Sequence, residues 1–302
     1  MEIRPPRLPS FGAKDVATIT IEHGMIKLLA CRGLRVVDYR VILANPRFFR
    51  EGQISNSARV GALIRNVLSE MEGKFSNIVA SVPGFQSRLR EIELPSVPGL
   101  NPRVLIPQEA NRLMRVSPET YHLEWYKRPA TLDRSRWLVV AAGRRTVASM
   151  LDTARQARVK IKALEPRPFA LARAVNQPDG VLVWVAHDGC DVVILRSSAP
   201  VEHQSLYWGA GMVESAVLVD RLTDFVGGTI SGYEQSSNAG VLSEEVPLYV
   251  LGTPIGADPS IAQQVAANLQ RSAGELTIPL VHPPDFPVQD LIVNVGLILR
   301  EA

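Results

Sequence analysis

The sequence predicts an α/β protein in which a unit of three strands, a helix and a fourth strand occurs twice. Three observations support this prediction. Closely spaced strand-like segments open the chain, a helical segment and a buried strand follow them, and the same series of elements begins again about 165 residues later. A meander followed by a crossover helix and another strand gives a mixed sheet with helices packed on it.

The first unit contains three β-branched or apolar segments separated by glycine-containing turns, at Val16–Glu22, Met25–Cys31 and Leu34–Ala44. The segment Ser57–Glu70 has apolar residues at the helical period, which predicts a helix. A buried strand is expected at Ile78–Val82, before the turn residues Pro83 and Gly84.

The second unit repeats this order. Its three strands are expected at Val181–Ala186, Val192–Arg196 and Val201–Leu206. A helix follows from Met212 to Phe225, and the fourth strand is Leu248–Leu251. Between that helix and that strand there is room for little more than one long helix. Further helices are expected at Ile261–Gln270 and Leu291–Arg300.

An inserted segment, Gln86 to Ala163, separates the two units. It reads as a strand, a helix, two strands and a helix, at Arg88–Leu94, Pro102–Arg115, Tyr121–Tyr126, Trp137–Ala142 and Thr146–Arg158. We therefore predict four parts, namely an N-terminal tail (1–14), a first subdomain (15–85) to which residues 287–302 return, an inserted α+β subdomain (86–163), and a second subdomain (164–286) with a reduced small lobe.

Three motifs, in this order, resemble the type IV pilus assembly protein PilM family. They are Ser81–Pro95, with its Pro-Gly turn and Arg-x-Ile-Glu-Leu-Pro strand, then Glu165–Arg173, and finally Val293–Arg300 with its Gly-Leu-Ile-Leu-Arg ending. The resemblance covers roughly Ala17 to Arg300. It implies a duplicated actin-like (RNase H-like) fold with an inserted α+β subdomain and a reduced second lobe. Relatives of this kind, PilM and FtsA, are actin-like proteins that bind partners under the cytoplasmic membrane.

The resemblance also implies positions for a nucleotide site, and the first hairpin, Ile19–Lys27, departs from the family pattern there. Lys27 is kept, whereas Thr20 stands in place of the carboxylate that handles the metal. A threonine hydroxyl offers no charge to a divalent ion. Glu22 and the residue after it replace Gly-Thr before Gly24, and a carboxylate in the cradle would repel phosphate.

The second hairpin departs from the pattern too. Trp184 falls at the second family aspartate, Asp191 matches a later acidic position, and Gly252 keeps one glycine of the adenosine turn. We therefore expect a pseudo-ATPase rather than an enzyme, with no catalytic residue and no cofactor. Residual binding of ATP and magnesium through Lys27 and backbone donors is left open. The cluster His187–Asp191 has metal-ligating residue types, but no second cluster supplies further ligands, so no metal site is expected.

The expected function is that of a scaffold in a type IV pilus or competence-type assembly machine. The resemblance implies a partner, the cytoplasmic N-terminal segment of a PilN-like bitopic membrane protein, bound beside the inserted subdomain. An extended peptide could add to an edge strand there. The candidate groove residues on the strand Arg88–Leu94 are Arg88, Arg90 and Ile92.

Composition limits the location and leaves two alternatives. Two cysteines exclude a disulfide framework, and no apolar run reaches the ~18 residues of a membrane span, so we expect a cytoplasmic protein. The resemblance further implies that it lies peripheral to the inner face of the cytoplasmic membrane. Residues 212–302 carry a net charge of −8 and the rest carries +11, with ten basic residues between Arg134 and Arg173. One alternative is an ATP-binding actin-like protein or an ATPase with an atypical site. The other is a basic module for anionic lipid or nucleic acid, where nucleic acid is disfavoured because no aromatic residues are interleaved to stack bases.

Overall fold

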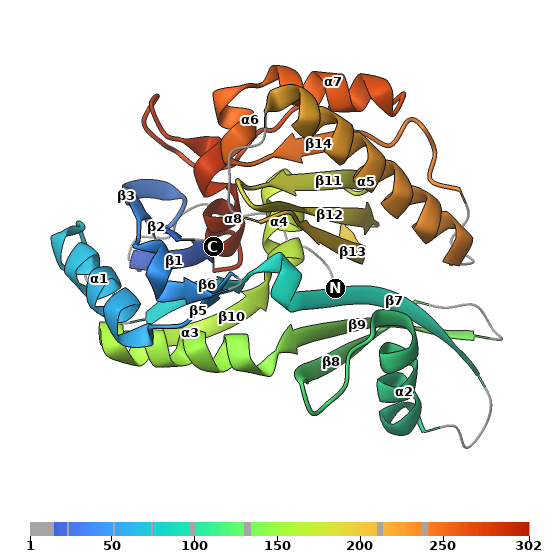
Figure 1. Ribbon diagram of the computed structural model, residues 1–302, viewed down its shortest axis with the longest axis horizontal. Coiled ribbons are helices and arrows are strands. Elements are labelled where there is room, and N and C mark those ends of the chain that lie inside the picture. The colour runs from blue at the N-terminus through green and yellow to red at the C-terminus, as the bar shows by residue number, and fades with distance from the viewer. Residues whose placement is uncertain are drawn as a thin grey trace.

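Two β-sheets cross the molecule, and the helices α4 (Arg167–Val175) and α8 (Val288–Ile298) lie between them (Figure 1). The computed structural model describes residues 15–301 apart from residues 23, 51, 74, 76, 97–100, 130–133, 210–213 and 237–240. The predicted tail, residues 1–14, lies outside the described residues. Within the described part of the chain, no helix has both the length and the apolar character of a membrane span.

The first sheet has the strand order β10-β6-β1-β2-β3. Its strands are β1 (Asp15–Glu22), β2 (Met25–Arg32), β3 (Arg35–Leu43), β6 (Asn77–Val82) and β10 (Lys160–Pro166). β1, β2 and β3 form an antiparallel meander, and β6 pairs in parallel with both β1 and β10. A 3₁₀ turn, η1 (Pro46–Phe48), and a short hairpin of β4 (Phe49–Arg50) and β5 (Gln53–Ile54) lead from β3 into α1.

The helices α1 (Ser57–Glu70) and α3 (Arg144–Ala157) cover the outer face of the first sheet. The side chain of Asn56 caps α1 by accepting a hydrogen bond from the backbone N–H of Arg59 at 3.1 Å. Gly61 lets the two helices approach closely, because a Cβ there would overlap the side chain of Gln156. The helix α3 therefore packs with the first sheet, although the sequence assigns it to the inserted subdomain.

The second sheet has seven strands in the order β14-β11-β12-β13-β7-β9-β8. Its strands are β7 (Ser87–Pro95), β8 (Tyr121–Arg128), β9 (Arg134–Gly143), β11 (Gly180–Val185), β12 (Gly189–Arg196), β13 (Ala199–Tyr207) and β14 (Leu248–Leu251). The strand β7 pairs with β9 along its length and with β13 at two positions, where Leu89 lies opposite His203 and Arg90 opposite Glu202. The inserted strands therefore extend the sheet of the second unit, and β7 has a neighbouring strand on both sides.

Helices cover both faces of the seven-stranded sheet. On one face lie α5 (Ser215–Ser236) and α7 (Ser260–Asn268), with α2 (Pro102–Met114) packed over the inserted strands β7 to β9. On the other face lie α4 and α8. The short elements η2 (Gly84–Gln86) and α6 (Thr253–Ala257) connect strands to these layers. The predicted boundary at residue 163 falls inside β10. β10 belongs to the first sheet and α3 packs on it, which leaves β7, α2, β8 and β9 as the inserted segment.

Gly296 sets the contact between the two central helices. A Cβ at this position in α8 would overlap the backbone carbonyl of Ala170 in α4, and backbone cannot move aside as a flexible side chain can. The surrounding residues of α8 are buried from Leu291 to Ile298. Gly296 belongs to the C-terminal motif Gly-Leu-Ile-Leu-Arg, and this contact gives that glycine a physical role.

We expect Gly296→Ala to lower the free energy of unfolding by about 3 kcal/mol, because the added methyl group forces α4 and α8 apart. The matched control is Gly232→Ala, an exposed position on α5 where a Cβ meets nothing within 4 Å. That change should raise stability by about 0.4–1 kcal/mol through the lower entropy of the unfolded chain. Urea denaturation of both variants measures the difference, and the same sign of change in the two variants contradicts the prediction.

Candidate functional site

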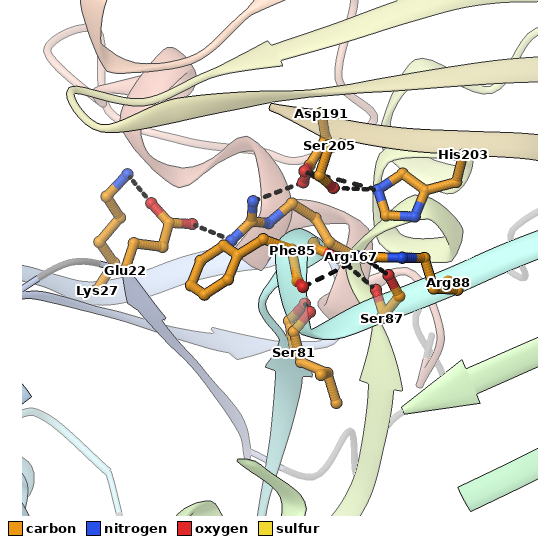
Figure 2. A network of polar contacts seen from close by, with 12 residues as sticks. Glu22, Lys27, Ser81, Phe85, Ser87, Arg88, Arg167, Asp191, His203 and Ser205 are labelled. Carbon is orange, nitrogen blue, oxygen red and sulfur yellow. Dashed lines mark hydrogen bonds and ion pairs between the residues drawn. The ribbon is translucent and has the colours of Figure 1, made fainter. Parts of the chain in front are cut away.

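A row of buried charged side chains lies where the two sheets approach each other (Figure 2). Glu22 and Lys27 come from the β1–β2 hairpin, Arg167 from the first turn of α4, and Asp191 from β12. These elements are far apart in the chain, and the crossing of the sheets brings them together. The row lies at the positions that the family resemblance gives to the nucleotide.

Positive and negative groups alternate along this row. Lys27 Nζ lies 2.9 Å from Glu22 Oε2, and Glu22 Oε1 lies 3.7 Å from Arg167 Nη2. Arg167 Nη1 donates a hydrogen bond of 2.6 Å to Asp191 Oδ2. All four residues are at most 5% exposed. Burying a charge is costly unless it is paired, so the loss of any one member removes a counter-charge from a buried neighbour.

Trp184 supports the row from the side. The guanidinium carbon of Arg167 lies 3.6 Å from the centroid of its ring, and Lys27 Nζ lies 5.9 Å away. An aromatic face attracts a cation, most strongly when both groups are removed from water. Trp184, which the resemblance aligns with the second carboxylate position, therefore holds an arginine. Among the described residues, its Nε1–H has no hydrogen-bond partner.

Asp191 is also bound on its second oxygen. Ser205 Oγ donates to Asp191 Oδ1 at 2.6 Å, and His203 Nε2 lies 3.6 Å from the same atom. Burial alone would raise the pKa of Asp191, but Arg167, His203 and Ser205 outweigh burial and hold the pKa of this carboxyl well below its usual range. Gly84 leaves the space that the carboxylate occupies, since a Cβ there would overlap both of its oxygens.

Thr20 is bound to the C-terminal helix. Its Oγ1 donates to Asn294 Oδ1 at 3.0 Å, and Asn294 Nδ2 donates to the backbone oxygens of Thr18 and Lys27, both at 3.2 Å. Lys27 Nζ in turn donates to Thr253 Oγ1 at 3.3 Å. The hydroxyl at the first family carboxylate position thus ties β1 to α8.

The two predicted glycines shape the backbone around the row. Gly24 has φ +83° in the β1–β2 turn, and Gly252 has φ +117° before α6, both in the region that favours glycine. A Cβ at Gly252 would also overlap the backbone oxygen of Val185. The Gly252 N–H donates to Gln289 Oε1 at 3.0 Å, and Gln289 lies in the first turn of α8.

Little space remains among these side chains. The cavity bounded by Glu22, Arg167, Trp184 and Asp191 has a volume of about 10 Å³, which suits about one water molecule. Over the described residues, no three His, Cys, Asp or Glu side chains gather as a metal site would require. Among the described residues these charges pair with one another, but both carboxylate oxygens of Glu22 and Nε of Arg167 have no hydrogen-bond partner.

The predicted groove residues separate into two groups. Arg88 and Arg90 line a cavity of about 290 Å³ between β7, β13 and the end of α2. Ile92 does not line it. Its side chain is 2% exposed and packs beneath α2 in the core of the inserted segment, so the expectation that Ile92 contacts a partner disagrees with the structure.

Sequence reasoning missed Arg167, Gly84, Ser205 and His203 as members of the site. Arg167 lies in a predicted motif and was counted with the basic stretch. Its signal is local: Pro166 ends β10, and Pro168 occupies the first turn of α4, where no backbone donor is needed. Arg167 thus lies between two prolines, directly after β10, which is parallel to β6. This position places its side chain where the two sheets approach each other.

On the opposite side of the molecule from α5 and α7 lie α1 and α3 (Figure 1), and together with β10 they carry a surface of exposed basic residues, some of them from the basic stretch. α1 and α3 lie side by side there, and Arg65 Nη1 on α1 donates to the backbone oxygen of Gln156 on α3 at 3.3 Å. Its exposed basic residues are Arg59, Arg65, Arg144, Arg145, Arg155, Arg158, Lys160 and Lys162. Asp152 and Glu301 pair with Arg155 and Lys162 and neutralise part of the charge.

Known proteins resemble this chain in structure and not in sequence. A scan against protein-family models gives no match, and a search of curated proteins also gives none. A chain of the PilM-PilN type IV pilus biogenesis complex has a similar structure, with a TM-score of 0.75 and 18% sequence identity over 94% of this chain and 98% of that chain.

Two further solved structures share this architecture. The ethanolamine utilization protein EutJ from Carboxydothermus hydrogenoformans has a TM-score of 0.57 and 11% identity over 98% of this chain and 91% of that chain. The cytoplasmic domain of EpsL, an inner membrane component of the type II secretion system of Vibrio cholerae, has a TM-score of 0.52 and 12% identity over 95% of this chain and 94% of that chain. Identities this low establish the fold alone, and the predicted actin-like α/β fold is confirmed.

We expect Asp191→Asn to lower the free energy of unfolding by about 3 kcal/mol at pH 7, because Arg167 keeps only the more distant Glu22 as a counter-charge. The stabilisation from a carboxyl with a lowered pKa is complete above the unfolded value of about 4 and is lost as pH falls toward the folded value. The gap between wild type and variant should therefore be constant from about pH 8 to 5 and narrow below about pH 4.

Urea denaturation across this pH range measures the gap. The matched control is Asp220→Asn on the exposed side of α5, which should change stability by less than about 0.5 kcal/mol. Equal stability of Asp191→Asn and wild type at pH 7, or a gap that widens in acid, contradicts the assigned role of the carboxylate.

Proposed function

We propose that this chain is a non-hydrolysing scaffold of a type IV pilus-like or secretion assembly machine and that it belongs to the PilM family. Its partner in this proposal is the cytoplasmic N-terminal segment of a PilN-like bitopic membrane protein, and its place is the cytoplasmic face of the inner membrane. One observation carries the proposal. An actin-like fold similar to that in the PilM-PilN complex has a paired row of side chains at the nucleotide positions.

The buried row supports the absence of ATP turnover. Hydrolysis in an actin-like site needs carboxylates to hold a divalent ion, and here Thr20 and Trp184 are engaged with Asn294 and Arg167 instead. A triphosphate entering the cavity would meet the carboxylates of Glu22 and Asp191 and would have to displace the side chains that neutralise them. In this proposal the charge pairs, and not a bound nucleotide, hold the two sheets together.

The likeness to a pilus biogenesis complex and to a component of a secretion system supports the scaffold role. One of the similar structures is a complex of PilM with PilN, and another is the cytoplasmic domain of an inner membrane secretion component. The inserted segment is present here as a full layer of β7, α2, β8 and β9 with its own apolar core. A site for a partner beside this segment is compatible with a closed row of charges elsewhere in the molecule.

The test is a calorimetric titration of the purified protein with the cytoplasmic N-terminal segments of bitopic membrane proteins encoded beside it. One segment should bind saturably, and about 1 mM MgATP should change neither its Kd nor the melting temperature of the protein. A ligand present at 100 times its Kd stabilises by about 2.7 kcal/mol, so nucleotide binding would raise the melting temperature by several degrees.

A Lys27→Ala variant serves as the matched control for residual nucleotide binding and turnover. Turnover of MgATP by wild type above the level of this variant overturns the pseudo-ATPase assignment. Failure of every neighbouring segment to bind overturns the scaffold assignment.

A second candidate function, attachment to anionic lipid, is favoured by the exposed basic surface on α1 and α3. This surface and the acidic C-terminal part of the chain, residues 212–302 with a net charge of −8, give the molecule a strong charge asymmetry. A negative membrane surface attracts each nearby basic residue with about 1 kcal/mol and would orient the protein with α1 and α3 toward it.

We expect binding to vesicles of anionic lipid to weaken about tenfold or more in an Arg145→Gln/Arg158→Gln variant, since both guanidinium groups are exposed on that surface. An Arg103→Gln/Arg221→Gln variant removes the same charge elsewhere and should bind as wild type does. Co-sedimentation at about 0.05 and 0.3 M salt measures both variants. Equal binding to neutral vesicles, or stronger binding to an oligonucleotide, contradicts this candidate function.

A further inference from the structure

A cavity of about 290 Å³ lies between the strands β7 and β13 and the C-terminal end of α2, away from the buried row. Its volume is near the lower limit of sites that take small ligands, and far above that of a single water. Three arginines line it, Arg88 and Arg90 on β7 and Arg115 directly after α2. Glu202 of β13 is the acidic residue of this wall.

The positive charge of the cavity is only partly compensated. Arg90 is paired, because its Nε lies 3.2 Å from Glu202 Oε2 and its Nη1 donates to the backbone oxygen of Leu113 at 3.5 Å. Arg88 donates only to neutral acceptors, the backbone oxygens of Phe85 at 3.2 Å and Ser87 at 2.9 Å. Within the described residues, no carboxylate pairs with Arg88 or Arg115. Two of the three arginines that line this cavity therefore have no carboxylate partner among the described residues.

Rigid elements hold these groups in place. The strand β7 is paired with β9 on one side and with β13 on the other, at the level of Arg90. Arg115 caps α2 in the left-handed conformation with φ 54°, and its N–H donates to the backbone oxygen of Asn111 at 3.0 Å. Strand pairing and the end of α2 therefore fix the backbone positions from which these arginines extend.

We propose that this cavity binds a side-chain carboxylate of an extended acidic peptide, with Arg88 and Arg115 as its charge partners. Arginine forms strong, often bidentate, hydrogen bonds with carboxylates. Leu113 and Met114 on the wall suit the aliphatic part of a glutamate. Glu202, 3% exposed on the same wall, disfavours a doubly charged phosphate more than a singly charged carboxylate.

This inference rests on the proposed function, since it names the chemistry that the chain recognises in a partner segment. It also changes which residues matter. Arg90, one of the two arginines singled out in the sequence, is already neutralised by Glu202 and serves to hold β13 against β7. Arg115, from a different element, takes its place beside Arg88.

The experiment titrates the full chain, by calorimetry, with the synthetic peptide acetyl-Gly-Glu-Glu-Gly-amide, with its Gln-Gln counterpart, and with inorganic phosphate. The Glu-Glu peptide should bind at least about tenfold more tightly than the other two probes, because only it offers a singly charged carboxylate. Arg88→Gln and Arg115→Gln should each weaken its binding by about tenfold. Arg103→Gln removes a charge at the other end of α2 and should leave Kd within about twofold.

Equal binding of the Glu-Glu and Gln-Gln peptides, tighter binding of phosphate, or unchanged Kd in both arginine variants at wild-type melting temperature overturns the proposal. A neighbouring membrane segment that binds equally well after its acidic residues are changed to amides overturns this inference while leaving the scaffold function intact. If the Glu-Glu peptide binds but no neighbouring membrane segment does, the scaffold function is overturned while the carboxylate site in this cavity is supported.

Discussion

The arrangement of the two sheets depends on one buried arginine. Arg167 lies between Glu22 of the first sheet and Asp191 of the second, with its guanidinium against the ring of Trp184. A charge this deeply buried is stable only when its partners surround it, and those partners come from both sheets. Separating the sheets would leave Arg167 and at least one carboxylate uncompensated. The relative position of the two halves therefore follows from charge pairing as well as from apolar packing.

The apolar contribution comes from the two central helices. α4 and α8 fill the space between the sheets, and Gly296 allows their backbones to meet at Ala170. Asn294 on α8 adds hydrogen bonds to Thr18, Thr20 and the backbone of Lys27. The helix α8 lies near the end of the chain, and β1 contains the first described residues. Formation of this core therefore joins distant segments, with a sequence separation of 276 between Thr18 and Asn294. The polar row and the central core are thus parts of one interface.

The order of strands and helices was predictable from periodicity and turns, because three-strand meanders and amphipathic helices leave local patterns. The pairing of β7 with β13 was not, since Leu89 and Arg90 carry no local sign that a strand more than a hundred residues later lies beside them. For the site, residue substitutions at Thr20, Glu22 and Trp184 were visible against the family pattern. Their new contacts with Asn294, Lys27 and Arg167 were not, because a pattern of residue types does not say which side chains meet across two sheets.

The continuous seven-stranded sheet has a mechanical consequence. The inserted strands are hydrogen-bonded to β13 of the second unit, whereas the chain enters them from β6 and leaves them into α3, both of which belong to the first sheet. The inserted segment is therefore fixed to the second half by strand pairing and joined to the first half at two short crossings, η2 and the start of α3. A force applied to the inserted segment by a bound partner would therefore act on both sheets, through β13 on one side and through the two crossings on the other.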